Sequence, residues 1–177
     1  MLIRPHFFLY HGGKVRFYHI KDDYIAFLRK YDATVAENKQ ESRPYVGIVC
    51  EINGIKYYAP FTSPKPKHLK MKNGKDFRKI KQGEYGAINF NNMIPVPDSA
   101  LILIDIANIA DAQYQRLLQN QYKEISKDIV AIEKTACELR TLVFSDDSTL
   151  TEHDKAIKNR CCNLPVLESV YKGYENS

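Results

Sequence analysis

No apolar run in this sequence approaches the roughly 20 residues that a membrane-spanning helix needs. The opening MLIRPHFFLYHGGK has only a few consecutive apolar residues, interrupted by Pro5 and followed by Gly12-Gly13. It lacks the continuous apolar centre and the small-residue cleavage site of a signal peptide. These absences argue against an anchored or exported protein, so we expect a cytoplasmic protein without a membrane partner.

Cysteine is scarce and tryptophan is absent. The four cysteines, Cys50, Cys137, Cys161 and Cys162, do not show the CxxC spacing of a zinc site. Nothing pairs them into the disulfide framework of a secreted domain, so we expect reduced, structural thiols. The chain also lacks a P-loop, a GxGxxG fingerprint and a Ser-His-Asp spacing, which are common signs of nucleotide binding and nucleophilic catalysis.

Positive charge is concentrated in one segment. The chain has 177 residues, which favours one domain, and a formal net charge of +5. Residues 64–81 contain eight basic residues and one acid, a net +7, so the rest of the chain carries −2. These basic residues, called here the basic segment, are Lys65, Lys67, Lys70, Lys72, Lys75, Arg78, Lys79 and Lys81. A local patch of one sign implies an anionic partner.

The first half of the chain reads as strands with one early helix. Residues 15–20 form a short strand pattern, and apolar residues over 21–37 have helical spacing with one buried face. A polar connector covers 38–43. Two strand-like runs, 45–52 and 55–61, are joined by Asn53-Gly54. Because both residues tolerate positive φ, this pair predicts a tight β-hairpin.

The second half becomes helical. Further strand-like runs cover 85–90, 93–96 and 100–106, and helical spacing follows over 109–144. That span exceeds a typical globular helix, so we expect two helices with a break near Ser126. A polar loop over 145–153 and a short helix over 164–171, with Pro165 in its first turn, complete the pattern. The layout is α+β, with an antiparallel or mixed sheet.

The basic segment has more than one interpretation. Most charge runs are solvated loops, but like charges repel unless an anion lies among them. Its prolines, with Asn73 and Gly74, favour a loop over an amphipathic membrane helix. Contact with the phosphate backbone of RNA or DNA is therefore the preferred interpretation. A plain solvated loop, an acidic protein or a lipid remain alternatives.

A hydroxyl-bearing turn precedes the basic segment. Thr62-Ser63-Pro64 could simply end a strand. Beside Lys65, however, its hydroxyls could donate hydrogen bonds to a phosphate while the ammonium stabilises the charge. Metal-dependent nuclease chemistry needs clustered carboxylates, which this stretch lacks. RNA offers its own 2′-OH as the nucleophile, and His68 could titrate near neutral pH. Structural roles are expected for the other histidines.

The order and spacing of several segments resemble the ToxN/AbiQ-like endoribonuclease toxins of type III toxin–antitoxin systems. The most specific segment is Tyr58-Ala59-Pro60-Phe61-Thr62-Ser63-Pro64-Lys65, with His68 close behind. Other matching segments are 17–20, 24–28, 45–49, 52–54, 86–90, 93–96, Leu118 onward and 162–171. The resemblance covers roughly 15–171 and predicts a single toxin domain over 15–177, with 1–14 as an extension.

The resemblance implies a compact, strongly curved sheet flanked by helices. It also implies cleavage of cellular or phage RNA without metal or cofactor, leaving a 2′,3′-cyclic phosphate. The inhibitor would be a small pseudoknotted antitoxin RNA, cut from tandem repeats by the toxin and held with it in a closed ring. Such systems act in phage defence by abortive infection.

The resemblance also implies which residues act. The essential serine of the family corresponds to Ser63, with Thr62 and Lys65 beside it, and Arg43 corresponds to a basic residue that is often lysine. An aromatic residue expected slightly earlier is replaced here by Lys39-Gln40. The predicted catalytic set is thus Ser63, Thr62, Lys65, Arg43 and His68. Lys39, together with the cations of the basic segment other than Lys65, would bind RNA. The alternatives are a non-catalytic RNA-binding module, in which Thr62-Ser63 only shapes the loop, and a basic scaffold for an acidic protein.

Overall fold

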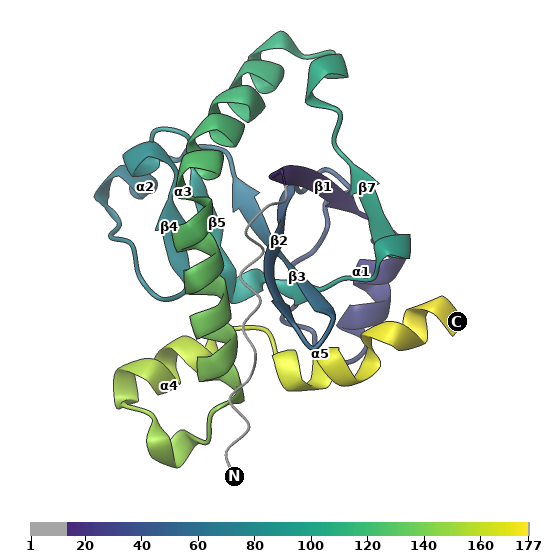
Figure 1. The fold of residues 1–177 in the computed structure, drawn as a ribbon, viewed down its shortest axis with the longest axis vertical. Helices are drawn as coiled ribbons and strands as arrows, with labels where there is room; N and C mark the ends of the chain where they lie inside the picture. The colour runs from purple at the N-terminus through teal and green to yellow at the C-terminus, as the bar shows by residue number, and fades with distance from the viewer. Residues whose placement is uncertain (1–13, 177) are drawn as a thin grey trace.

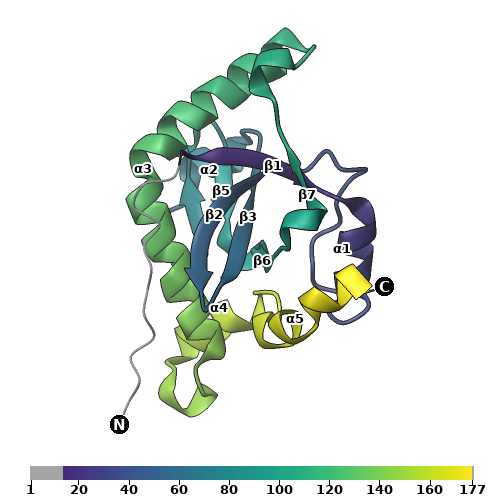
Figure 2. The same ribbon diagram turned by 45° about the vertical axis from the view of Figure 1, so that its right-hand side comes forward.

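The computed structural model describes residues 14–176, and its centre is a twisted antiparallel sheet. Within this part of the chain seven strands pair in the order β4-β5-β3-β2-β1-β7, with β6 paired to β3. Their bounds are β1 Arg16–Ile20, β2 Tyr45–Ile52, β3 Ile55–Thr62, β4 Phe77–Lys79, β5 Ala87–Asn89, β6 Ile94–Pro95 and β7 Leu101–Leu103. In Figures 1 and 2, β2 and β3 run across the direction of β1, so the sheet is strongly twisted. The predicted α+β class is confirmed.

The hairpin of β2 and β3 is the long central pair of this sheet. Asn53 and Gly54 have φ values of 53° and 77°, as the predicted tight turn requires. Tyr45 pairs with Pro60 at the far end, and the register shifts between Gly47 and Cys50. This irregularity increases the local twist of the hairpin.

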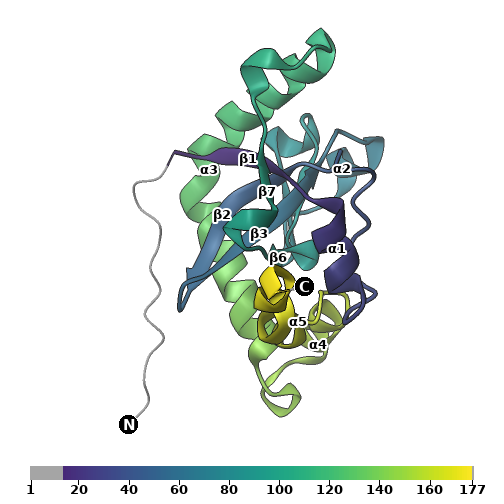
Figure 3. The same ribbon diagram turned by 90° about the vertical axis from the view of Figure 1, so that its right-hand side faces the viewer.

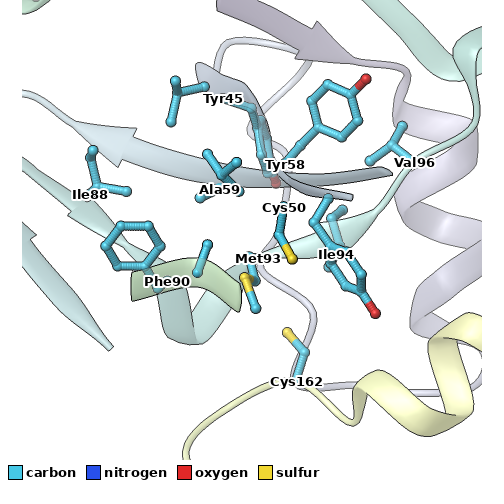
Figure 4. Close-up of a cluster of buried hydrophobic side chains, with 14 of the residues drawn as sticks. Tyr45, Cys50, Tyr58, Ala59, Ile88, Phe90, Met93, Ile94, Val96 and Cys162 are labelled. Carbon is cyan, nitrogen blue, oxygen red and sulfur yellow. The ribbon is translucent and has the colours of Figure 1, made fainter. Parts of the chain in front are cut away.

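The core lies against β3. Tyr45, Tyr58 and Phe90 are almost fully buried there, and Figure 4 shows them with Met93, Ile94 and the Cys162 thiol. The short helix α5, Leu164–Val170, follows Cys162 and packs against β6 beside α1 (Figure 3). The predicted helix over 164–171, with Pro165 in its first turn, is therefore confirmed.

One continuous helix covers the sheet, where two were predicted. Helix α3 runs over Ala112–Phe144 and packs on β2 (Figure 1). Asp111 caps it, accepting a hydrogen bond from the backbone N–H of Tyr114 at 2.9 Å. The helix does not break near Ser126 because its buried residues Leu118, Ile125 and Ile132 recur every seven positions. This apolar face packs continuously on the sheet, and tertiary packing outweighs the weak helix propensity of serine.

The other helices differ from the prediction in length or position. Helix α1 covers only Asp22–Arg29 of the predicted 21–37, because Asp32 closes a turn, accepting from the backbone N–H of Thr34 at 2.9 Å. The basic segment is not only a loop, since it contains α2, Pro66–Lys70, and strand β4. Helix α4, Glu152–Asn159, was missed, although Thr151 caps it by accepting from the backbone N–H of Asp154.

The expectation of four reduced cysteines is wrong. Cys50 on β2 and Cys137 on α3 form a disulfide, with Cα atoms 5.4 Å apart. The packing of α3 on β2 brings together two residues 87 positions apart, which cysteine spacing cannot show. Cys161 and Cys162 are free and buried, and burial raises the pKa of each thiol to about 12. The predicted extension over 1–14 lies almost wholly outside the described residues.

Candidate functional site

The hydroxyl turn begins where β3 ends. Thr62 is the last residue of the strand and is half-buried, whereas Ser63, Pro64 and Lys65 are exposed. Prolines cannot donate to a strand ladder, so Pro64 and Pro66 end the pairing, and Pro66 instead starts α2. The turn therefore presents the Ser63 hydroxyl and the Lys65 ammonium to solvent, side by side in sequence.

The turn is supported from behind by two residues that the sequence did not single out. The buried Gln121 of α3 donates from Nε2 to the carbonyl oxygens of Thr62, at 3.3 Å, and Tyr85, at 2.8 Å. Gly86 has φ +97°, and a Cβ atom there would lie 1.8 Å from the Thr62 carbonyl oxygen. No local pattern marks Gln121, whereas the glycine-rich stretch around Tyr85 was a usable signal for a tight backbone.

His68 lies behind Lys65 and is buried. Its Nδ1 accepts a hydrogen bond from the backbone N–H of Lys65 at 3.2 Å, and its ring packs near that of Phe77. Burial, and then the charges of Lys67 and Lys65, lower the pKa of His68 below its ordinary value. The neutral imidazole therefore holds the start of α2 in place, a contact that the sequence did not predict.

Arg43 reaches the same end of the sheet by strand register. The carbonyl of Pro44 accepts from the backbone N–H of Phe61 at 3.1 Å, which places Arg43 opposite the end of β3. Its side chain donates from Nε to the Glu37 carbonyl at 2.9 Å. Lys39 is exposed, with φ +53°, and no contact described here joins it to the turn.

A cavity of about 480 Å³ adjoins the turn. Thr62, Lys65 and His68 contribute to its lining, together with Phe77, Asn89, Asn91, Ile157 and Arg160. Arg160 forms two hydrogen bonds with the buried carboxylate of Asp76, at 2.5 and 3.1 Å. Cations, side-chain amides and an aromatic ring thus surround a space next to the hydroxyl turn.

The basic segment is partly neutralised by acids, two from distant helices and one from the same turn. Lys75 pairs with Asp154 at 2.5 Å, Arg78 with Asp128 at 2.9 Å and Lys81 with Glu84 at 3.0 Å. Among the residues that the structure describes, the cations of this segment without an ion pair are Lys65, Lys67, Lys70, Lys72 and Lys79. The predicted RNA-binding residues of the basic segment therefore include both free and paired cations. The net charge of +7 counted for residues 64–81 does not distinguish the two.

Neither a metal-binding cluster nor a membrane-spanning helix is found among the described residues. Within residues 14–176, no three His, Cys, Asp or Glu side chains are grouped so that they could hold a metal ion. The helices in this range are each too short or too polar to cross a membrane.

The fold agrees with that of small toxin ribonucleases, and comparison with known proteins identifies the family. Residues 16–172 match the family described as toxin ToxN of the type III toxin–antitoxin system, so the chain belongs to that family. The endoribonuclease ToxN of Bacillus thuringiensis is 32% identical, covering 90% of this chain and 84% of its own. The endoribonuclease ToxN of Pectobacterium atrosepticum is 29% identical, covering 90% and 94%.

Solved structures agree with this assignment. One type III toxin, selectively inhibited by a non-coding RNA pseudoknot, has a TM-score of 0.81 and 31% identity, covering 93% of this chain and all of its own. The anti-phage endoribonuclease AbiQ has a TM-score of 0.75 and 25% identity. The resemblance expected from the sequence is therefore confirmed.

Proposed function

We propose that this protein is a metal-independent endoribonuclease toxin of a type III system, acting in the cytoplasm. The observation that carries the proposal is the exposed pair of Ser63 and Lys65 on a turn that Gln121 and Gly86 hold from behind. Family membership supplies the enzyme class, because the similar curated relatives are endoribonucleases. The turn supplies the candidate chemistry.

The proposed reaction uses the RNA's own nucleophile. The 2′ oxygen attacks the adjacent phosphorus, its proton goes to a base, the bond from phosphorus to the 5′ oxygen breaks, and that oxygen takes up a proton. The products are a 2′,3′-cyclic phosphate and a 5′-hydroxyl. The exposed Ser63 donates a hydrogen bond to a non-bridging oxygen, where negative charge develops, whereas the predicted Thr62 hydroxyl is buried behind it, without a partner among the described residues. Lys65 and Arg43 stabilise that charge, and proton transfer involves Lys65 or His68, because the Arg43 guanidinium does not deprotonate.

The cations without ion pairs would guide the RNA to the turn. Lys67, Lys70 and Lys72 follow Lys65 along and after α2, and all three are exposed. Each phosphate that they neutralise releases a counterion and strengthens binding. The neighbouring cavity would accept a nucleotide next to the scissile phosphate. Substrate and inhibitor RNA would share this path.

The proposed inhibitor is a pseudoknotted antitoxin RNA, processed from tandem repeats by the toxin and bound with it in a closed ring. This part of the proposal rests on family membership and on relatives described with a pseudoknot inhibitor or a processed non-coding RNA that regulates an antiviral system. The biological role would be phage defence by abortive infection.

The decisive experiment incubates purified protein with total bacterial RNA in excess EDTA. Cleavage should persist and leave 2′,3′-cyclic phosphate and 5′-hydroxyl ends, identified by mass spectrometry. Ser63→Ala should lower the rate by about 10²–10³ through the loss of one oxyanion contact. A 2′-deoxy nucleotide at a mapped cut should block cleavage but not binding. RNA binding without cleavage by the wild type would favour the non-catalytic module, and 5′-phosphate products would exclude the proposed mechanism.

A further inference from the structure

The Ser63 side chain is held only through the backbone, since no hydrogen bond of its hydroxyl is found among residues 14–176. Its direction therefore depends on the peptide that joins it to Thr62. That peptide is planar, so fixing the Thr62 carbonyl also fixes the plane containing the Ser63 nitrogen and Cα. Whatever holds this carbonyl therefore holds the backbone from which the Ser63 hydroxyl projects.

Gln121 is the side chain that reaches this carbonyl. It is 1% exposed and lies on the face of α3 that packs against the sheet. One nitrogen, Nε2, donates to the Thr62 carbonyl at 3.3 Å and to the Tyr85 carbonyl at 2.8 Å. The amide thereby links the end of β3 to the chain just before Gly86.

The second carbonyl matters because Gly86 lies directly against the turn. A Cβ atom at Gly86 would be 1.8 Å from the Thr62 oxygen and 3.0 Å from the Ser63 carbonyl carbon. The sheet already brings these segments together, since Thr62 of β3 pairs with Ala87 of β5, and the Gln121 amide adds a donor that the Thr62 and Tyr85 carbonyls share. A buried amide that pairs two carbonyls is a device for holding backbone, because each carbonyl left without a donor would be costly.

We infer that Gln121 is a positioning residue for catalysis: it orients the Thr62–Ser63 peptide, and through it the Ser63 hydroxyl, without touching RNA. The inference rests on the proposed function, since it assigns Gln121 a role in the chemistry of Ser63. It predicts a defect in the chemical step rather than in RNA binding, because the exposed lysines are unaffected.

The chain offers a matched control on the same helix. Gln115 of α3 also donates from Nε2 to two carbonyls, those of Ile106 at 3.0 Å and Ala107 at 2.8 Å. These belong to the segment before α3 and not to the turn. Gln115→Met and Gln121→Met therefore each remove two hydrogen bonds from one side-chain amide of α3 to two carbonyls. Only the pair made by Gln121 supports Ser63.

The experiment measures single-turnover cleavage of an RNA oligonucleotide that spans a cut mapped in total RNA. Binding is measured on the same oligonucleotide with a 2′-deoxy nucleotide at the cut. Gln121→Met should cleave about 10²-fold more slowly, the expected effect of displacing a reacting group by about 1 Å. Its dissociation constant should stay within about twofold of wild type, and Gln115→Met should cleave at the wild-type rate. A wild-type rate for Gln121→Met, or an equal loss for Gln115→Met, would overturn the inference.

A second variant distinguishes a loss of positioning from a general folding defect. In Gln121→Glu the neutral carboxyl can donate one hydrogen bond to a carbonyl, whereas the carboxylate can donate none. Its cleavage rate relative to wild type should therefore rise as the pH is lowered, at unchanged affinity. A pH-independent ratio would contradict the inference. Ser63→Ala, run in parallel, separates the failures: if that variant cleaves normally, the proposed function falls too, whereas an inactive Ser63→Ala leaves it standing.

Discussion

The α-carbon of Gly86 lies so close to Thr62 that a methyl group on it would be 1.8 Å from the Thr62 carbonyl oxygen. The glycine also has φ +97°, which L side chains rarely adopt. Close approach and backbone conformation therefore both demand glycine at this position, directly behind the hydroxyl turn.

Gly86→Ala should reduce RNA cleavage about 10²-fold or more, because the turn must shift by more than the tolerance of a reacting group. Gly54→Ala is the matched control: Gly54 has φ +77°, but a Cβ there would meet nothing within 4 Å. Both variants carry the backbone cost of about 1–2 kcal/mol for a left-handed residue. Only Gly86→Ala should lose activity, and single-turnover rates beside thermal unfolding measure the difference. Equal activities would show that the turn tolerates displacement.

The division of the basic segment into free and paired cations predicts two different salt dependences. Replacing Lys67, Lys70 and Lys72 by alanine should make the negative slope of log K against log salt shallower by about 2–3, which is close to one unit per lost phosphate contact. Replacing Lys75, Arg78 and Lys81 removes the same charge, but these residues already face Asp154, Asp128 and Glu84. The slope should change less in this second variant. Filter binding of RNA across a salt series measures both, and equal changes would mean that the ion pairs open when RNA binds.

Much of the sheet could be predicted from local chemistry. Asn53-Gly54 favours a tight turn, and the runs on either side are rich in the β-branched and aromatic residues typical of strands. The hydroxyl turn and its lysine were also recognisable, because their side chains act outward from one short segment.

The remaining features depend on contacts between distant segments. Arg78 looks like a free cation until α3 brings Asp128 to 2.9 Å. Gln121 looks like an ordinary polar residue until its position on α3 places it under Thr62. The continuity of α3 through Ser126 likewise comes from packing against the sheet. Helix α4 is different, since its capping residue, Thr151, is itself a local signal for the start of a helix.

The disulfide between Cys50 and Cys137 predicts a stability that depends on reductant. It closes a loop of 87 residues and should contribute about 2–5 kcal/mol to the free energy of unfolding, mainly by constraining the unfolded chain. Replacing both cysteines by alanine should lower stability in oxidising buffer and have a smaller effect in dithiothreitol. Urea unfolding in both buffers measures this, with peptide mapping under non-reducing conditions as the direct check. Equal stability of the wild type in the two buffers would contradict the prediction.

The contact between His68 and Lys65 predicts how stability depends on pH. Burial and the neighbouring lysines lower the pKa of His68 in the folded protein, so the unfolded chain binds a proton at His68 more readily. Stability should therefore fall as the pH drops below about 6.5, the ordinary value for histidine, and this loss is complete below the folded-state pKa. Protonation would also break the hydrogen bond that Nδ1 accepts from the Lys65 N–H.

His68→Gln should remove this part of the pH dependence, because a glutamine oxygen can accept the Lys65 N–H without titrating. His153→Gln is the control, since His153 is exposed and has no such contact in the part of the chain described. Urea unfolding of the three proteins between pH 5 and 7.5 measures the difference. The difference in free energy of unfolding between wild type and His68→Gln should shift in favour of the variant as the pH falls. A gap independent of pH would mean that His68 stays accessible to protons in the folded protein.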